Sequence, residues 1–177
     1  MTDHRNQPSR KVREAVIIRD EGRCVVTGQL VVDPDTMRHL SQYSLQHRRA
    51  RGMGGSRDTV TNSAVNLILV EGTGTTGAHG RIECHRDWAR RMGYAVSHWA
   101  DPTSVPVKHH RHGWAWITPT GYHPLTQSEL WLQAGTWLVD ELRLRGIDDT
   151  DVEGVTRLST AAAELFGVLA ADVRRAA

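Results

Sequence analysis

The chain has 177 residues, of which 39% are hydrophobic and 24% are charged, a composition typical of a globular protein with a core of its own. Its length fits one domain with an appendage. The 2 cysteines are too few for a disulfide framework, and no apolar run approaches the ~18 residues that cross a membrane. The N-terminus lacks the apolar segment of a signal peptide, so we expect a cytoplasmic location.

Charge is distributed unevenly along the chain. Residues 1–118 carry 17 Lys and Arg against 11 Asp and Glu, whereas residues 119–177 carry 5 against 9. A basic front part and an acidic rear part assign any contact with a polyanion to the first two thirds of the chain. An imbalance of this size also keeps a surface solvated, so it indicates a partner only in combination with other features.

The front of the chain predicts a helix and a tight turn. Residues 1–9 are polar and are expected to form a disordered tail. Apolar positions at helical spacing predict a short helix over 10–20 with Ser9 as its N-cap. The sequence C-V-V-T-G at residues 24–28 matches half of a zinc knuckle, with Thr27 in place of the second thiolate. Because a hydroxyl is a poor zinc ligand, we expect no structural zinc knuckle here.

The central stretch holds most of the polar residues that could carry chemistry. Alternation predicts a strand in which His47 shares a face with two apolar positions and points toward the interior. An almost continuously apolar run predicts a second, more buried strand. In order, the expected elements are a strand over 43–49, a glycine-rich ordered loop over 50–64, a strand over 66–70, and a helix over 78–92 after a glycine-threonine turn.

A histidine-rich tract follows. Residues 108–112 read K-H-H-R-H, which resembles a metal-binding tract by composition. Adjacent histidines do not have the i,i+4 spacing of helical ligands, so we favour an exposed basic turn. The aromatic run at 113–117 predicts a strand.

The rear of the chain changes to helical periodicity. Apolar residues recur at helical spacing over 128–145 and over 156–175. The segment 146–151 between them contains the helix breakers. We expect two acidic-leaning helices that form either a hairpin packed on the front domain or an oligomerisation element.

Three polar residues of the central stretch could together cut a phosphodiester, which requires a base for water and a cation for the developing charge. They are His47, Asn66 and His79, within H-R-R-A-R-G-M-G-G-S, N-L-I-L and H-G-x-I-E-x-H. With these strings, the stretch resembles HNH endonucleases of the ββα-metal class. The sequence G-T-G-T-T-G-x-H-G most resembles that of small HNH proteins of bacteriophages. The resemblance covers roughly residues 10–123.

The resemblance implies a role for each matching residue. His47 would be the general base that activates water. Asn66 would brace the loop that carries His47 or, as in some members, bind the metal through its amide oxygen. His79 would be a metal ligand, and Glu83 matches the position of a second one. The cofactor would be one divalent ion, Mg²⁺ or Mn²⁺, with Ni²⁺ or Zn²⁺ as alternatives.

One position departs from the family pattern. Where members commonly have an acidic or histidine ligand before the base, this chain has Gln46, whose amide oxygen can bind Mg²⁺ or Mn²⁺ but adds no charge. Gln46 is therefore a metal-ligand candidate of lower affinity, and Glu83 becomes more important. His85 would lie about 200° round a continuous helix from Glu83, so we leave it out of the ligand set.

Basic residues near the motif are candidates for contacts with the DNA backbone. They are Arg48, Arg49, Arg51 and Arg86. Such contacts position DNA without reading its sequence. A solvated helix face or surface explains the same charges equally well.

The expected fold class is α+β, with a ββα-metal core, flanking short strands and a helical pair at the C-terminus. A nuclease domain is predicted over 10–123 and a helical extension over 124–177. The leading function is a metal-dependent DNA endonuclease, in phage genome packaging beside a terminase or as a mobile or defence nuclease. The alternative is a non-catalytic module that binds DNA or a packaging protein, with possible self-association through residues 126–175. A zinc deaminase is disfavoured because its P-C-x-x-C half is absent.

Overall fold

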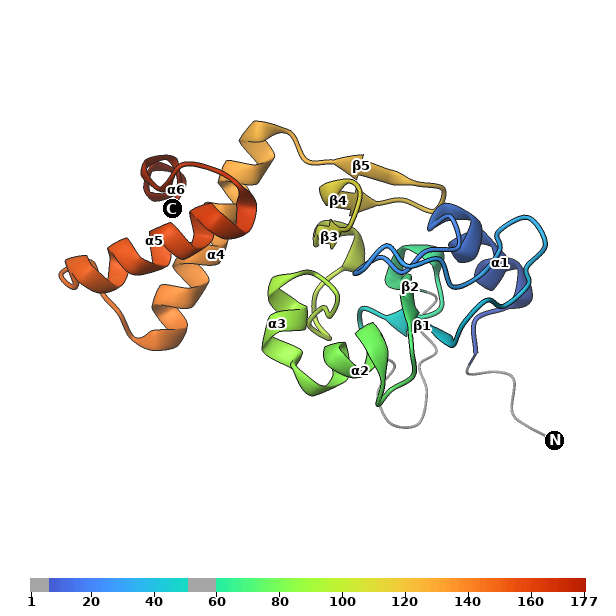
Figure 1. Cartoon of the computed structure of the whole chain (residues 1–177). Coiled ribbons are helices and arrows are strands. Elements are labelled where there is room, and N and C mark those ends of the chain that lie inside the picture. The colour runs from blue at the N-terminus through green and yellow to red at the C-terminus, as the bar shows by residue number, and fades with distance from the viewer. Residues whose placement is uncertain (1–6, 51–59) are drawn as a thin grey trace. The chain divides into compact units, whose positions relative to one another are not determined.

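The computed structural model describes residues 7–50 and 60–177 of the chain. It is a mixed α+β structure with two small antiparallel sheets and separate helices (Figure 1). The chain divides into two compact units, Met1–Pro124 and Leu125–Ala177. No helix in the described residues combines the length and apolar character needed to cross a bilayer.

Helix α1, Arg10–Arg19, begins as its sequence predicts. The Ser9 hydroxyl accepts a hydrogen bond from the Val12 N–H at 3.3 Å, which caps the first turn. The chain reverses after the helix at Gly22, whose φ is +66°. A Cβ at this position would lie 1.9 Å from the Val32 carbonyl oxygen, so only glycine fits the turn.

Strands β1, Tyr43–His47, and β2, Leu67–Glu71, form the two-stranded antiparallel sheet. In their register His47 lies opposite Leu67, and a short 3₁₀ turn at Ala64–Asn66 leads into β2. β2 is buried along most of its length, as its apolar run predicts. Helix α2, Gly77–Cys84, contacts both strands (Figure 1).

The single helix expected over 78–92 is wrong, because the structure has two. The backbone leaves helical geometry at His85, with φ −121° and ψ 64°, and resumes as α3, Arg86–Arg91. The break turns α3 so that Trp88 lies under the Arg81 guanidinium, 3.9 Å from the ring centroid. No glycine or proline marks this break in the sequence, so periodicity alone missed it.

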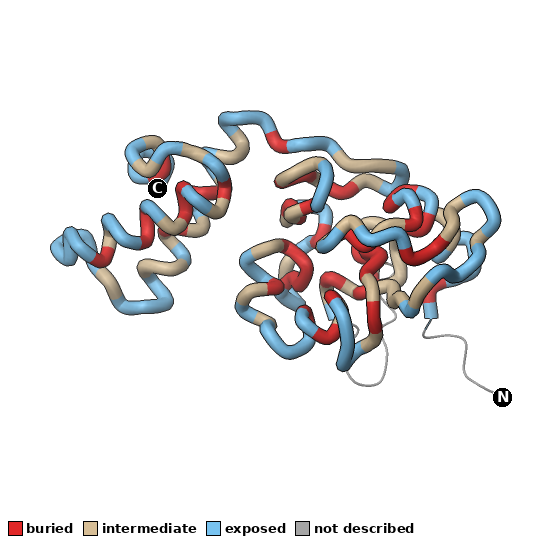
Figure 2. Tube along the Cα trace, viewed as in Figure 1, coloured by how far each residue is buried: buried red, intermediate tan, exposed pale blue. Residues whose placement is uncertain are grey.

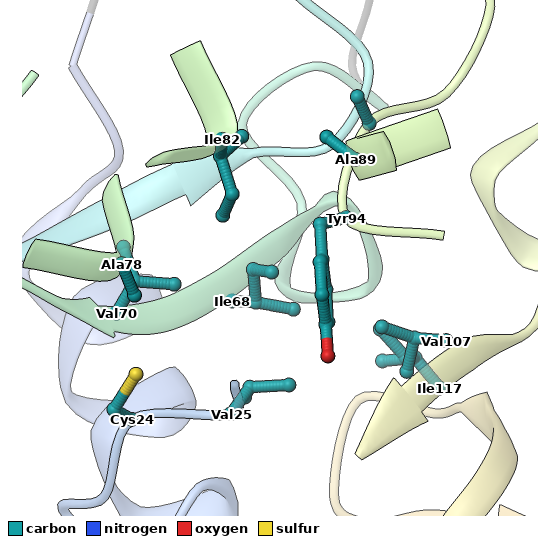
Figure 3. Close-up of a cluster of buried hydrophobic side chains, with 11 residues drawn as sticks. Cys24, Val25, Ile68, Val70, Ala78, Ile82, Ala89, Tyr94, Val107 and Ile117 are labelled. Atoms are coloured by element: carbon teal, nitrogen blue, oxygen red, sulfur yellow. The ribbon is translucent and has the colours of Figure 1, made fainter. Parts of the chain in front are cut away.

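The main core joins β2, α2 and the segment after α3. Ile82 of α2 points toward Ile68 of β2, and the ring of Tyr94 lies beside them (Figure 3). Cys24 is fully buried in the same cluster, as a small hydrophobic residue of the turn at residues 24–28. The buried positions of the first unit gather where these elements meet (Figure 2).

A three-stranded antiparallel sheet follows, in the order β3-β4-β5, with strands Val107–His109, Gly113–Ile117 and Tyr122–Pro124. The histidine tract forms the β3–β4 turn. His109 is 5% exposed, however, so the expected exposed turn is wrong at this residue. The Nδ1 atom of His109 accepts the N–H groups of Arg111 and His112, and its ring packs on Tyr122. His109 therefore stabilises the turn.

A buried ion pair connects α1 to both sheets. Arg19 donates to both carboxylate oxygens of Asp20, at 2.7 and 3.0 Å, and also to the carbonyls of Ala64 and Leu67. Asp20 in turn accepts the Leu69 N–H of β2 and the Tyr122 hydroxyl of β5. All of these partners are satisfied, which lets two charges remain in the interior.

The second unit consists of α4, Gln127–Arg145, α5, Val152–Phe166, and α6, Ala170–Ala176. A capping box of Thr126 and Glu129 begins α4. The helix expected over 156–175 is interrupted, because Gly167 takes φ +71° and ends α5. The rear of the chain is therefore three helices that contact one another (Figure 1).

Candidate functional site

His47 and His79 line the same pocket, although 31 residues separate them in the sequence. The pocket has a volume of about 730 Å³ and lies along β1. β1 brings His47 to it as the last residue of the strand, and the glycine-threonine turn brings His79 on the first turn of α2. The other lining residues are Gln7, Pro8, Arg13, His39, Leu40, Ser41, Gln42, Tyr43, Ser44, Leu45 and Thr73.

His47 is half-buried, and Asn62 holds its imidazole. The Nε2 atom of His47 lies 3.0 Å from the Oδ1 atom of Asn62. Because an amide oxygen can only accept, Nε2 carries the proton in this contact and the lone pair of the neutral ring is on Nδ1. This tautomer makes Nδ1 the atom that can take a proton from water.

Asn66 is fully buried and closes the loop between the two strands. Its Oδ1 atom accepts the Arg49 N–H at 2.7 Å, and its Nδ2 atom donates to the carbonyls of Arg49 and Thr61 at 3.0 and 2.9 Å. The side chain thus ties together both ends of the loop that follows His47. Because the amide oxygen of Asn66 already accepts the Arg49 N–H, this geometry favours a loop-bracing role for Asn66 over metal ligation.

His79 has a buried ring nitrogen without a partner. No described residue forms a hydrogen bond with Nδ1, and the side chain is 19% exposed. Burial lowers the pKa of His79, and nearby Arg86 adds to this shift while Glu83 opposes it. The ring is therefore neutral at pH 7, which is the state that binds a metal.

Glu83 lies one helical turn beyond His79, with its Oε1 atom 4.0 Å from Nε2. Two atoms that bind one ion at about 2.1 Å stand about 3 to 3.5 Å apart, so a small side-chain rotation would bring these two within range. Glu83 also accepts from Arg86 at 3.3 Å, which competes for the same oxygen. Among residues 7–50 and 60–177, no group of three or more His, Cys, Asp or Glu is placed to hold a metal ion. At this site the described residues offer the pair His79 and Glu83.

Gln46 is not brought to the pocket. Its side chain is on the opposite face of β1, 4% exposed, and its Nε2 atom donates to the His47 carbonyl at 3.0 Å. The expectation that the face of Tyr43, Leu45 and His47 points to the interior is wrong. Tyr43 and Leu45 are half-buried, whereas Gln46 and Arg48, on the other face, are buried.

Arg48 does not fit the predicted role of a DNA contact. It is 1% exposed and donates to four backbone carbonyls, those of Gly93, Pro102, Val105 and Pro106. Its guanidinium is therefore a structural crosslink between the end of β1 and the segment before β3. The charge of an arginine does not reveal whether carbonyls or solvent will surround it, so the sequence could not separate Arg48 from its neighbours.

The other predicted DNA contacts have different positions. Arg49 is half-buried, its backbone is held by Asn66, and it forms an isolated β-bridge with Val96. Arg86 is near the surface of α3 and pairs with Glu83. Arg51 lies outside the described residues.

Sequence reasoning missed two parts of this site. Asn62 was only one of several polar residues in a loop, and its partner His47 is 15 residues away. The far wall of the pocket comes from α1 and the segment before β1, which the motif does not include. Long-range contacts of this kind leave no periodic signal.

Comparisons of the chain with protein-family models, with curated proteins and with solved structures found no match.

Proposed function

We propose that the chain is a metal-dependent endonuclease of the HNH type, which hydrolyses DNA phosphodiester bonds. The observation that supports this most is the meeting of His47 and His79 in one pocket, from a strand and a helix of the β1-β2-α2 succession. The sequence strings around them resemble the same family. A base and a metal ligand are the two groups that phosphodiester hydrolysis needs.

In the proposed reaction, Nδ1 of His47 accepts a proton from a water molecule as the water oxygen forms a bond to phosphorus. The bond from phosphorus to the leaving oxygen breaks, and that oxygen takes a proton from solvent. Asn62 keeps His47 in the required tautomer, and Asn66 fixes the loop behind it. His79, with Glu83, would hold one divalent ion, which supplies positive charge to offset the charge developing on the phosphate.

Plasmid cleavage tests this proposal. Supercoiled plasmid is incubated with the protein and Mg²⁺, Mn²⁺, Ni²⁺ or Zn²⁺ in turn, and the open-circular and linear products are measured. We expect conversion with at least one metal and none in EDTA. Intact plasmid with every metal at high protein concentration would contradict the proposal.

A non-catalytic DNA- or protein-binding module is the second candidate. It is favoured by the pairing of Glu83 with Arg86 and by the lack of a third ligand in the described residues. Metal titration separates the two functions. Loss of Mn²⁺ binding in His79→Ala and Glu83→Ala supports the nuclease, whereas unchanged binding in both variants supports the module.

A further inference from the structure

The pocket extends well beyond the two histidines of the proposed nuclease. At ~3.3 Å per residue, Tyr43 lies about 13 Å from His47 along β1, which is the rise of about four stacked nucleotides. A second cavity of about 210 Å³ continues past Tyr43, and Arg13, His39, Tyr43 and Leu45 line both. The hollow surface is therefore longer than a single phosphate requires.

Two aromatic rings form part of this far wall. The Tyr43 hydroxyl lies 3.1 Å from the Nε2 atom of His39, and the rings meet edge to face with centroids 4.9 Å apart. The contact fixes both rings relative to each other. Rings held in this way provide a stacking surface for a nucleobase at little cost in conformational entropy.

A positive charge lies beside the rings. Arg13 is exposed on α1 and forms no ion pair with a described residue, whereas its neighbour Arg10 is paired with Glu14 at 2.6 Å. An unpaired guanidinium that lines a pocket is suited to a phosphate.

Two residues that line the pocket have a buried polar atom without a hydrogen-bond partner. Only three buried side-chain atoms of the described residues have no hydrogen-bond partner, and they belong to Ser41, His79 and Trp137. Ser41, which precedes β1, and His79, which is in α2, both line this pocket. Buried polar groups normally have partners, so the protein alone does not satisfy the polar groups at this pocket.

We propose that Arg13, His39 and Tyr43 form a subsite for an unpaired nucleotide of a DNA strand. The phosphate of the same strand that is cut would lie at His47. A base in a duplex is stacked on both faces and cannot reach a ring wall inside a pocket, so the nucleotide must be unpaired. The volume of about 730 Å³ is within the range of ligand pockets. This inference rests on the proposed nuclease for its orientation, and it predicts a preference for substrates with a single-stranded segment.

Binding in EDTA tests the subsite without cleavage. Fluorescence anisotropy with labelled oligo-dT and a duplex of the same length gives the two affinities for each variant. We expect the wild type to prefer the single strand. Tyr43→Leu should weaken single-strand binding by about 5- to 100-fold, the loss of one stacked base, and Arg13→Ala should weaken it and lower its salt dependence.

Matched variants control for folding and for general charge. Lys11→Ala removes a charge from an exposed residue of α1 that lines neither cavity, and we expect unchanged binding. Tyr43→Phe keeps the ring and should bind within about 3-fold of the wild type. If Tyr43→Leu fails to fold by circular dichroism, His39→Ala at its exposed position replaces it.

Wild-type affinity in both Tyr43→Leu and Arg13→Ala, or equal losses in Lys11→Ala and Arg13→Ala, would overturn the subsite. The outcome is separable from that of the proposed nuclease. Intact plasmid with every metal, together with weakened oligo-dT binding in the variants, would remove the nuclease and keep the subsite. Plasmid cleavage by the wild type, together with unchanged oligo-dT binding in the variants, would keep the nuclease and remove the subsite.

Discussion

In the proposed nuclease, Asn62 controls which nitrogen of His47 acts as the base, because its amide oxygen accepts from Nε2 at 3.0 Å. Asn62→Ala removes this acceptor, and the ring can then rotate or change tautomer. We expect the single-turnover cleavage rate to fall by about 10- to 100-fold, measured on a labelled oligonucleotide.

Asn62→Asp is the matched control, since a carboxylate keeps the acceptor. It should retain most of the rate and shift the rising limb of the pH–rate profile to higher pH, because a negative charge raises the pKa of His47. Equal rates in Asn62→Ala and the wild type would show that the contact does not orient the base.

Arg48 is expected to stabilise the fold, because its guanidinium donates hydrogen bonds to four interior carbonyls. Arg48→Met leaves these acceptors unpaired and should lower the free energy of unfolding by about 3–5 kcal/mol, measured by urea denaturation. Arg90→Met, at an exposed position of α3, should change it by less than about 0.5 kcal/mol. A similar small effect in both variants would contradict the crosslink.

His109 gives the fold a defined pH dependence. Burial, together with the neighbouring histidines, lowers the pKa of His109 to about 3, and its Nδ1 lone pair is already used by two N–H groups. The unfolded chain binds a proton near pH 6.5, so this residue's contribution is full above that pH and is lost as pH falls toward 3.

Urea denaturation at several pH values measures this effect. The wild type should lose up to about 1.4 kcal/mol per pH unit from this one proton between pH 6.5 and 3, and His109→Gln should remove that part of the slope. His123→Gln, at an exposed position of β5, is the matched control for the loss of a histidine. An identical slope in the wild type and His109→Gln would contradict the account.

At the scale of elements, α2 can place His79 in the pocket only because it begins close to the preceding turn. A Cβ at Gly80 would lie 2.5 Å from the carbonyl carbon of Thr75. Gly80→Ala should therefore move the start of α2 and weaken both Mn²⁺ binding and cleavage. Isothermal titration with Mn²⁺ measures the first effect.

Gly74 provides the control for this element. A Cβ there would meet no atom within 4 Å, so Gly74→Ala should bind Mn²⁺ and cleave as the wild type does. Normal metal binding in Gly80→Ala would show that the close approach of α2 is not needed.

The sequence predicted those elements whose local pattern agrees with their tertiary setting. The N-cap at Ser9, the apolar run of β2 and the breakers after Arg145 all appear where expected. It failed where tertiary contacts decide, as in the break at His85 and the burial of Arg48. Periodicity reports which face of a helix is apolar, but it does not report whether the helix continues past a core contact.

The candidate site shows the same division. The motif selected His47 and His79, and the structure brings both to one pocket. The motif could not indicate Asn62, Tyr43 or Arg13. Asn62 contacts His47 from the loop, and Arg13 and Tyr43 reach the pocket from outside the motif. The metal ligands and DNA contacts remain predictions, apart from Arg48, whose carbonyl partners leave it no DNA-facing surface.

At the scale of the whole molecule, the residues of the pocket and of the main core lie in the first unit. A fragment of residues 1–124 should therefore unfold cooperatively and retain most of the cleavage activity. Urea denaturation and the plasmid assay measure both properties. An unfolded fragment, or a fragment that is inactive where the whole chain cleaves, would contradict this prediction.

In the proposed nuclease, His47 is the general base. The most direct measurement is the single-turnover cleavage rate of the wild type and His47→Ala, with the metal that works best and with folding checked by circular dichroism. Loss of general base catalysis predicts a rate at least about 100-fold lower in His47→Ala with an unchanged fold. A folded His47→Ala protein that cleaves DNA at the wild-type rate would contradict the claim.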